Sequence, residues 1–530
     1  MFAVIAIFFA LLSFGQGEDQ GRRQQPPGQQ PTPTPQVSAS PSSSNAQTAP
    51  QRSPQERPAQ PAEEPPIVTR HEIKAAGRTL RYTATVGMMP IKSRDGETEA
   101  RIFFMAYTLD DAGARGRRPL TFSFNGGPGS ASVWLHLGAI GPKRVRMNSD
   151  GTMPAPPFDL VDNDQTWLNQ TDLVFIDPVG TGYSRAVRPD LAAKFFGLNG
   201  DIESVGEFIR MYLTRYERWT SPLFLAGESY GTTRASALSG YLVDRGIALN
   251  GIVLISTIMN FATTNFAAGN DLPYVLFLPS YAATAWYHKK LAADLQARSV
   301  QDLVAEVERW TATDYALALE KGDRLAPQER QEVVARLSRY TGLDARFIDN
   351  ANLRVSLNLF RKELLRSERR SIGRLDSRFK GFDSNFATDS PDFDASEAAI
   401  RPPYTSTFNN YVRTELGYKT DLEYYILGGG ITSPWNWGTN NNYVDTSVAL
   451  RTALAKNPYL KIFVAMGYYD MATPYFAAEY TLHHISLDPL LLKNFSTGYY
   501  EAGHMMYIDE KSLGQMRADV GKFIQSSINR

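Results

Sequence analysis

Residues 223–231 read LFLAGESYG, an apolar run that leads directly into Gly227, Ser229 and Gly231. This pattern fits the G-x-S-x-G turn between a strand and a helix, which exposes a strained serine at the edge of a sheet. Glycines are required because the turn leaves no room for side chains beside the serine. The following residues, TTRASALSGYLV, are compatible with a helix. The stretch therefore predicts a strand, a sharp turn that presents Ser229 as a nucleophile, and a helix.

Short apolar runs recur on both sides of this turn, with helical patterns such as 202–218 between them. The runs cover residues 120–124, 173–176, 223–226, 252–255 and 460–465. Runs of this length are typical of strands buried on both faces of a mostly parallel sheet, and their alternation with helices indicates an α/β protein. Segments 79–86 and 100–109 predict an antiparallel hairpin before them. We expect an α/β-hydrolase fold, with helices on both faces of the central sheet.

A glycine-rich loop follows the run at 120–124, and residues 122–132 read FSFNGGPGSAS. Consecutive glycines let a backbone approach a bound carbonyl, and α/β-hydrolases take their second oxyanion donor from a loop at this place in the chain order. By itself such a loop is also consistent with a tight turn. Its position upstream of Ser229 predicts that the backbone N–H groups of Gly127 and Tyr230 form an oxyanion hole.

The fold requires an acid and then a histidine after the serine. Only His504, in GYYEAGHMMY, follows a final strand-like segment; His483 and His484 lie in a helical pattern, and His288 falls in a helical region. Asp470, in KIFVAMGYYDMATPY, follows the next-to-last strand, although a solvated turn aspartate is the alternative. We expect Asp470 to orient His504, and His504 to take the proton from Ser229 and pass it to the leaving group.

The amino-acid composition excludes several kinds of active site. The chain has 530 residues and no cysteine, which excludes a thiol nucleophile, disulfides and thiolate zinc ligation. Lys+Arg and Asp+Glu both number 55, so the net charge does not indicate nucleic acid as a partner. The expected acyl-enzyme mechanism needs no metal and no cofactor.

The pattern changes between residues 261 and 421, where long charged amphipathic helices are expected over 301–321, 327–340 and 353–368. We interpret residues 261–421 as a helical cap over the edge of the sheet, with an independent helical domain as the alternative. Residues 67–260 and 422–530 then form the catalytic domain. Trp435 and Trp437, in SPWNWG, are interpreted either as walls of the substrate pocket or as core aromatics.

The N-terminus predicts export. Residues 1–14 read MFAVIAIFFALLSF, an apolar run of signal-peptide length, so residues 1–17 are predicted to be a signal peptide. A stray hydrophobic N-terminus is the alternative. Residues 18–66 are rich in Pro, Gln and Ser and predict a disordered linker. We expect a periplasmic or extracellular protein with no stable membrane span after signal removal.

Five motifs together resemble one known family. FNGGPGSAS, DPVGTGYS, GESYG, MGYYDMATPY and EAGHMMY, in this order, are similar to the serine carboxypeptidase family, peptidase family S10. The resemblance spans about residues 118–507. It implies a serine-type carboxypeptidase that releases C-terminal residues from peptides. It also implies that Asn125 and Glu228 bind the free carboxylate of the substrate, and that Gly127 and Tyr230 form the oxyanion hole.

Two features depart from the family pattern. Members with paired carboxyls have a second glutamate just before a Gly-Pro, whereas this chain has Ala139 two residues before Gly141 and Pro142. Eukaryotic members contain disulfides, so the absence of cysteine indicates a bacterial type of chain. The partner is expected to be a peptide or a small acyl substrate. An esterase or acyltransferase on the same triad, and an inactive binding protein, are the alternatives.

Overall fold

The structure, a computed structural model, describes residues 63–110, 113 and 115–528. The predicted signal peptide, and the predicted linker except for residues 63–66, lie outside the described residues. At the centre is a ten-stranded sheet in the order β1-β2-β3-β7-β4-β9-β10-β13-β14, with β8 paired to β3. The strands are β1 (Ile67–Ala75), β2 (Arg78–Lys92), β3 (Thr98–Leu109), β4 (Leu120–Phe124), β7 (Asp172–Ile176), β8 (Arg185–Ala186), β9 (Leu223–Ser229), β10 (Gly251–Thr257), β13 (Lys461–Gly467) and β14 (Phe495–Tyr500).

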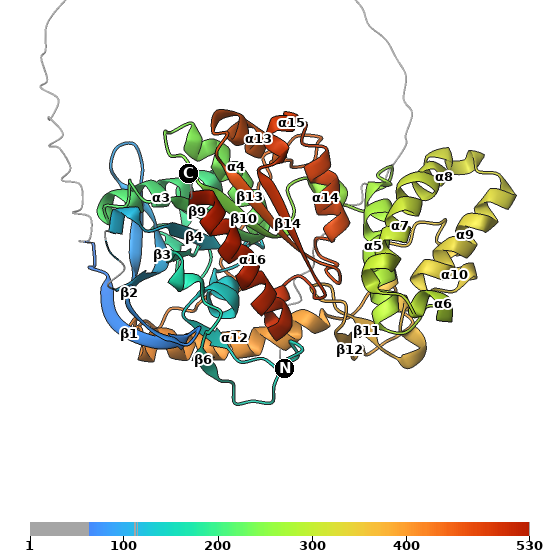
Figure 1. The fold of residues 1–530 in the computed structure, drawn as a ribbon, viewed down its shortest axis with the longest axis horizontal. Helices are drawn as coiled ribbons and strands as arrows, with labels where there is room; N and C mark the ends of the chain where they lie inside the picture. Colours follow the sequence, from blue (N-terminus) through green and yellow to red (C-terminus); the bar gives the residue numbers. More distant parts are fainter. Residues whose placement is uncertain (1–62, 111–112, 114, 529–530) are drawn as a thin grey trace, which may run out of the picture. The chain divides into compact units, whose positions relative to one another are not determined.

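Six neighbouring strands, from β7 through β14, run parallel, and β1, β2 and β3 join them in antiparallel pairs. Figure 1 shows β4, β9, β10, β13 and β14 side by side in the middle of the fold. Each predicted apolar run is a strand, and the predicted opening hairpin is formed by β2 and β3. The predicted α/β-hydrolase fold with a mostly parallel central sheet is confirmed.

Helices cover both faces of this sheet because successive strand residues point to opposite sides. In β10, Ile252 and Leu254 belong to one apolar core, whereas Val253 and Ile255 belong to the other. The helices outside the predicted cap are α1 (Val133–Leu135), α2 (Pro189–Ala192), α3 (Leu198–Arg215), α4 (Tyr230–Val243), α13 (Ser447–Lys456), α14 (Tyr475–His483), α15 (Pro489–Leu492) and α16 (Glu510–Ile528). Helices α3, α4, α13 and α14 pack on the first core, and α16 packs on the second.

The chain between β10 and β13 is mainly helical. It contains α5 (Leu272–Tyr287), α6 (Ala293–Gln296), α7 (Val300–Trp310), α8 (Ala316–Lys321), α9 (Pro327–Thr341), α10 (Ala345–Asn350), α11 (Leu357–Glu363) and α12 (Ala395–Thr414). It also contains the short strand pair β11 (Ser371–Ile372) and β12 (Lys380–Gly381). A second short pair, β5 (Lys143–Val145) with β6 (Leu160–Asp162), lies earlier in the chain. Helices α5, α6, α7, α8, α9 and α10 form a group beside the sheet in Figure 1, and together with α11 they enclose a third apolar core.

Helix α12 packs differently from the other helices of the predicted cap. Its residues Ile400, Tyr404, Phe408 and Tyr411 belong to the same apolar core as the sheet and α16. The division into a catalytic domain and a cap over 261–421 stays a prediction. Among the described residues, no helix combines the length and the apolar character needed to cross a bilayer.

Candidate active site

The turn between β9 and α4 places Ser229 in a strained backbone conformation. Strand β9 ends at Ser229, whose φ is 60° and ψ is −130°, and α4 begins at the next residue. A side chain at Gly227 would overlap the carbonyl of Gly231, and one at Gly231 would lie 2.8 Å from the carbonyl oxygen of Phe124. Positive φ in a serine is sterically costly and requires support from surrounding structure. The local geometry therefore has the features expected of a nucleophile turn.

The glycine-rich loop after β4 lies directly against this turn. A side chain at Gly126 would overlap the backbone nitrogen of Tyr230, so the close approach of the two segments requires glycine. Gly127 follows with a φ of 103°, in the left-handed region that favours glycine. The two backbones predicted to supply the oxyanion donors are therefore neighbours.

A buried arginine links these two segments. Arg234, 1% exposed, donates from Nη1 to the carbonyl of Asn125 at 2.7 Å and from Nε to Asp201 Oδ2 at 2.8 Å. The hydroxyl of Tyr230 donates to the same carboxylate oxygen at 3.2 Å. Arg234 and Asp201 together thus connect the residue before Gly126 to the residue after Ser229.

Asp470 and His504 are joined by a direct hydrogen bond. His504 Nδ1 lies 2.8 Å from Asp470 Oδ2, and both side chains are buried. Asp470 also accepts from the backbone of Ala472 at 2.8 Å, and from the backbone and hydroxyl of Thr473 at 3.0 and 2.8 Å. Burial by itself lowers the pKa of His504. The charge of Asp470 and its hydrogen bond together raise this pKa by more, so it stands above its usual value.

Residues 374–377 hold the loops that carry Asp470 and His504. The backbone N–H of His504 donates to Leu375 at 2.6 Å, and that of Gly503 donates to Asp376 Oδ2 at 3.1 Å. Met471 donates to the carbonyl of Arg374 at 3.1 Å. A segment from the predicted cap region therefore fixes both loops at once.

Ser229 is the last residue of β9, and the neighbouring strand β10 contacts the His504 loop. Ser229 pairs with Thr257 in the sheet, and the preceding Ser256 donates its hydroxyl to the His504 carbonyl at 2.6 Å. Among the hydrogen bonds of the described residues, none joins Ser229 to His504. The structure thus links Asp470 to His504 directly and places Ser229 on the neighbouring strand end.

Glu228 and Asn125 lie in a second polar cluster beside the turn. The hydroxyl of Tyr507 donates to Glu228 Oε2 at 2.5 Å, and Glu228 is 4% exposed. Burial raises the pKa of Glu228 to about 7, against the lowering effects of the charge of His504 and of the hydrogen bond from Tyr507. Asn125 accepts at Oδ1 from Leu135, while its buried Nδ2 has no hydrogen-bond partner among the described residues. A buried donor without a partner is suited to an acceptor supplied by a ligand.

The remaining histidines have other surroundings. His136 is buried against Tyr107, 2.7 Å from its hydroxyl, and burial lowers its pKa to about 3. His288 contacts the carbonyl of Ser377 at 2.7 Å, whereas His483 and His484 are exposed on and after α14. These positions agree with the choice of His504.

No sequence pattern marks several supporting residues, among them Arg234, Asp376 and Tyr507. No pattern marks a role for Asp177 either, which accepts from the backbone and hydroxyl of Ser132 at 2.8 and 2.7 Å and so braces the glycine-rich loop. Arginine and tyrosine are common, so only a spatial contact distinguishes these positions. Trp435 and Trp437, which the sequence left open, have ring centroids 5.6 and 5.9 Å from that of Tyr230.

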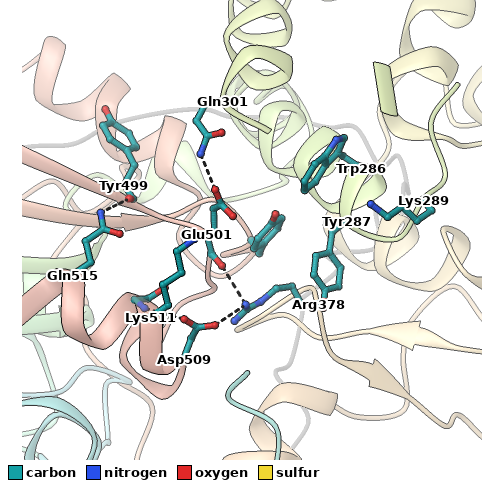
Figure 2. A pocket seen from close by; sticks show the side chains of 12 residues that line it. Trp286, Tyr287, Lys289, Gln301, Arg378, Tyr499, Glu501, Asp509, Lys511 and Gln515 are labelled. Atoms are coloured by element: carbon teal, nitrogen blue, oxygen red, sulfur yellow. Dashed lines mark hydrogen bonds and ion pairs between the residues drawn. The ribbon is translucent and has the colours of Figure 1, made fainter. Parts of the chain in front are cut away.

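A separate cleft of about 520 Å³ borders the same loops (Figure 2). Its lining residues are Trp286, Tyr287, Lys289, Gln301, Arg378, Tyr469, Tyr499, Glu501, Asp509, Lys511, Ser512 and Gln515. Figure 2 shows Arg378 directed toward Glu501 and Asp509. Its guanidinium donates to the backbone carbonyl of Glu501 and to the carboxylate of Asp509. None of the predicted site residues lines this cleft.

Comparison with known proteins identifies the family. The family model described as serine carboxypeptidase matches residues 84–518. The chain belongs to the serine carboxypeptidase family. The match covers every predicted site residue, from Asn125 to His504, and confirms the resemblance seen in the motifs. The bacterial type stays a prediction.

Individual relatives in this family are distant. The pheromone-processing carboxypeptidase KEX1 of Saccharomyces cerevisiae is 34% identical over 158 residues, which are 27% of this chain and 20% of that protein. Serine carboxypeptidase-like 36 of Arabidopsis thaliana is 28% identical over 167 residues, which are 30% of this chain and 32% of that protein. The aligned stretches thus span at most about a third of these two relatives. The crystal structure of Kex1(delta)p, a prohormone-processing carboxypeptidase from Saccharomyces cerevisiae, aligns at 17% identity with a TM-score of 0.49, covering 84% of this chain and 91% of that one.

Proposed function

We propose that this chain is a serine carboxypeptidase that releases C-terminal residues from peptides through an acyl-enzyme. The observation that carries the proposal is the 2.8 Å contact between His504 and Asp470 on loops beside the strained Ser229 turn. A base that is oriented by a buried carboxylate next to a half-buried serine is the arrangement used for acyl transfer. Membership of the serine carboxypeptidase family supports the same activity.

In the proposed mechanism, Ser229 attacks the scissile carbonyl while His504 takes its proton. Asp470 holds the imidazole with Nδ1 protonated and stabilises the positive charge that forms on it. The backbone N–H groups of Gly127 and Tyr230 stabilise the tetrahedral oxyanion. His504 then protonates the leaving amine, and water attacks the Ser229 ester by the reverse sequence of proton transfers.

The proposed selectivity for free C-termini depends on Asn125 and Glu228. The unpartnered Nδ2 of Asn125 can donate to a substrate carboxylate, whereas Glu228 can do so only while it is protonated. The pKa of Glu228, raised to about 7 by burial, keeps a large share of this side chain protonated in mildly acidic solution. The site therefore favours a peptide with a free C-terminal carboxylate.

We also propose that the protein is exported to the periplasm or the extracellular space. The apolar run at residues 1–14, followed by a Pro- and Gln-rich stretch, supports this localisation. Fractionation of producing cells tests it, because export predicts a mature chain that lacks the first residues outside the cytoplasm. A full-length chain in the cytoplasm would contradict it.

The activity is tested with a blocked dipeptide, its C-terminal amide and a simple ester of the same acyl group. A carboxypeptidase cleaves the free acid with a higher kcat/KM than the amide. Equal cleavage of the two contradicts carboxypeptidase selectivity and favours an esterase or acyltransferase. A fluorophosphonate probe should label the wild type and not Ser229→Ala. Equal labelling of both proteins would favour an inactive binding protein.

A further inference from the structure

The most informative contact outside the predicted site is that between Tyr507 and Glu228. The two side chains lie 279 positions apart in the chain, yet the Tyr507 hydroxyl donates to Glu228 Oε2 at 2.5 Å. Both are buried, so this hydrogen bond is shielded from competing water. Short hydrogen bonds to a carboxylate are among the strongest in proteins.

The Tyr507 ring packs directly against the backbone of Gly138. A side chain at Gly138 would overlap the Tyr507 ring and the Tyr404 hydroxyl, so the backbone there packs directly on both tyrosines. Tyr507 also lies in the short helical turn Met506–Ile508, which directly precedes α16. The ring therefore has little freedom to turn its hydroxyl away from Glu228.

We propose that Tyr507 is a positioning residue that holds Oε2 of Glu228, so that Oε1 faces the C-terminal carboxylate of a peptide substrate. This inference rests on the proposed function. Asn125 supplies the second donor, since its buried Nδ2 has no hydrogen-bond partner among the described residues. The recognised group is a free carboxylate, bound between an amide N–H and the O–H of a protonated Glu228.

A hydroxyl suits this role because it adds no charge to the subsite. Burial raises the pKa of Tyr507 well above its usual value, so the phenol remains a donor throughout the working range of pH. Its donation stabilises the ionised form of Glu228 and lowers the pKa of this carboxyl. Tyr507 thus affects both where the carboxyl points and the pH at which it loses its proton.

Other charged or titratable groups also act on Glu228. His504 lowers its pKa and Asp470 raises it, and Tyr404 interacts with it electrostatically. His504 itself must be neutral to act as a base. The pH profile of kcat/KM for one substrate therefore reports the titrations of Glu228 and His504 together. The ratio of kcat/KM for a free-acid substrate to kcat/KM for its amide removes this difficulty, because the His504 titration affects both substrates equally.

The test is this ratio, measured against pH for the wild type and for Tyr507→Phe. Glu228 is largely protonated at mildly acidic pH, and loss of the hydrogen bond that orients it predicts a ratio roughly 5- to 10-fold lower there. The pH at which the ratio has fallen by half (its midpoint) should rise by roughly one unit in Tyr507→Phe, because the ionised form of Glu228 loses a hydrogen-bond donor. An unchanged ratio and an unchanged midpoint would overturn the proposal.

Tyr411→Phe is the matched control. Tyr411 is a buried tyrosine of the same apolar core, and its hydroxyl lies 3.2 Å from that of Tyr107. Its removal should leave both the ratio and the midpoint unchanged. A ratio that falls equally in both variants would show that Tyr507 acts only through core stability, and would contradict the inference.

A double variant keeps the test valid if Tyr507→Phe unfolds. Glu228→Ala with Tyr507→Phe removes both partners of the hydrogen bond and leaves no buried acceptor unsatisfied, which is better tolerated than removal of one. If Tyr507 acts through Glu228, the double variant and Glu228→Ala have the same ratio. A further fall in the double variant would overturn the inference. If the wild type itself shows no preference for the free acid, the proposed function fails instead.

Discussion

Two buried carboxyls near the candidate site each accept a short hydrogen bond, yet their expected roles differ. Asp470 accepts from His504 at 2.8 Å, and Glu228 accepts from Tyr507 at 2.5 Å. Asp470 receives three further hydrogen bonds from Ala472 and Thr473 and raises the pKa of the imidazole beside it. Glu228 has the Tyr507 hydroxyl as its donor, and burial raises its own pKa to about 7. The donors around a buried carboxyl thus decide whether it orients an imidazole or itself donates a hydrogen bond.

The largest effect is expected from loss of the nucleophile. Ser229→Ala should reduce kcat for the free acid, the amide and the ester by about 10⁵-fold or more, because acyl transfer loses its attacking atom. Binding of a free-acid product should persist, since Glu228 and Asn125 are unchanged. Steady-state kinetics and product titration by calorimetry measure the two properties. A variant with wild-type kcat would show that another residue is the nucleophile.

Asp470→Asn tests the first pair without altering the second. The amide cannot hold the imidazole with Nδ1 protonated, so kcat should fall by about 10³- to 10⁴-fold. The ratio of free-acid to amide kcat/KM should stay as in the wild type because Glu228 keeps its partner. If this ratio fell together with kcat, the two pairs would not act independently.

A smaller loss is expected when the link between the oxyanion segments is weakened. Arg234→Lys keeps a positive charge beside Asp201 but cannot also bond the Asn125 carbonyl as the guanidinium does. Misplacement of oxyanion donors predicts a fall in kcat of about 10- to 100-fold for the amide and the ester, with KM for these two substrates changed little. Arg245→Lys, at an exposed position at the end of α4, is the control and should retain wild-type kcat. A rise in KM without a fall in kcat would contradict a role in the oxyanion hole.

The proposed reacting residues were easier to predict from the sequence than the residues that hold them. The chain has only six histidines, and fold order leaves His504, whereas Tyr507 is one of 26 tyrosines and no local pattern marks it. Ser229 was predictable because the turn itself requires neighbouring glycines. Arg234 reaches Asn125 across 109 positions, and Asp376 reaches Gly503 across 127, so neither partnership exists before the sheet assembles. Helix α12 likewise showed no sequence sign of packing with the sheet core, because its apolar residues fit either surface equally well.

The smallest and most specific effect is the pH dependence that separates the two pairs. Activity on the amide should rise with pH to a plateau, because His504 must lose its proton to act as a base and its pKa lies above its usual value. Activity on the free acid should follow the same rise and then fall as pH passes about 7, where Glu228 ionises and repels the substrate carboxylate. The ratio of the two kcat/KM values therefore falls with a midpoint near this pH.

Glu228→Gln sharpens this last test. The glutamine amide donates at every pH, so the ratio of free-acid to amide kcat/KM should become independent of pH while the rise assigned to His504 remains. Because Tyr507 can donate to the glutamine carbonyl, the side chain should keep the same orientation and the ratio should stay near its mildly acidic wild-type value. A ratio that still falls near pH 7 in this variant would assign the titration to a different group, and the contrast between the two carboxyls would not hold.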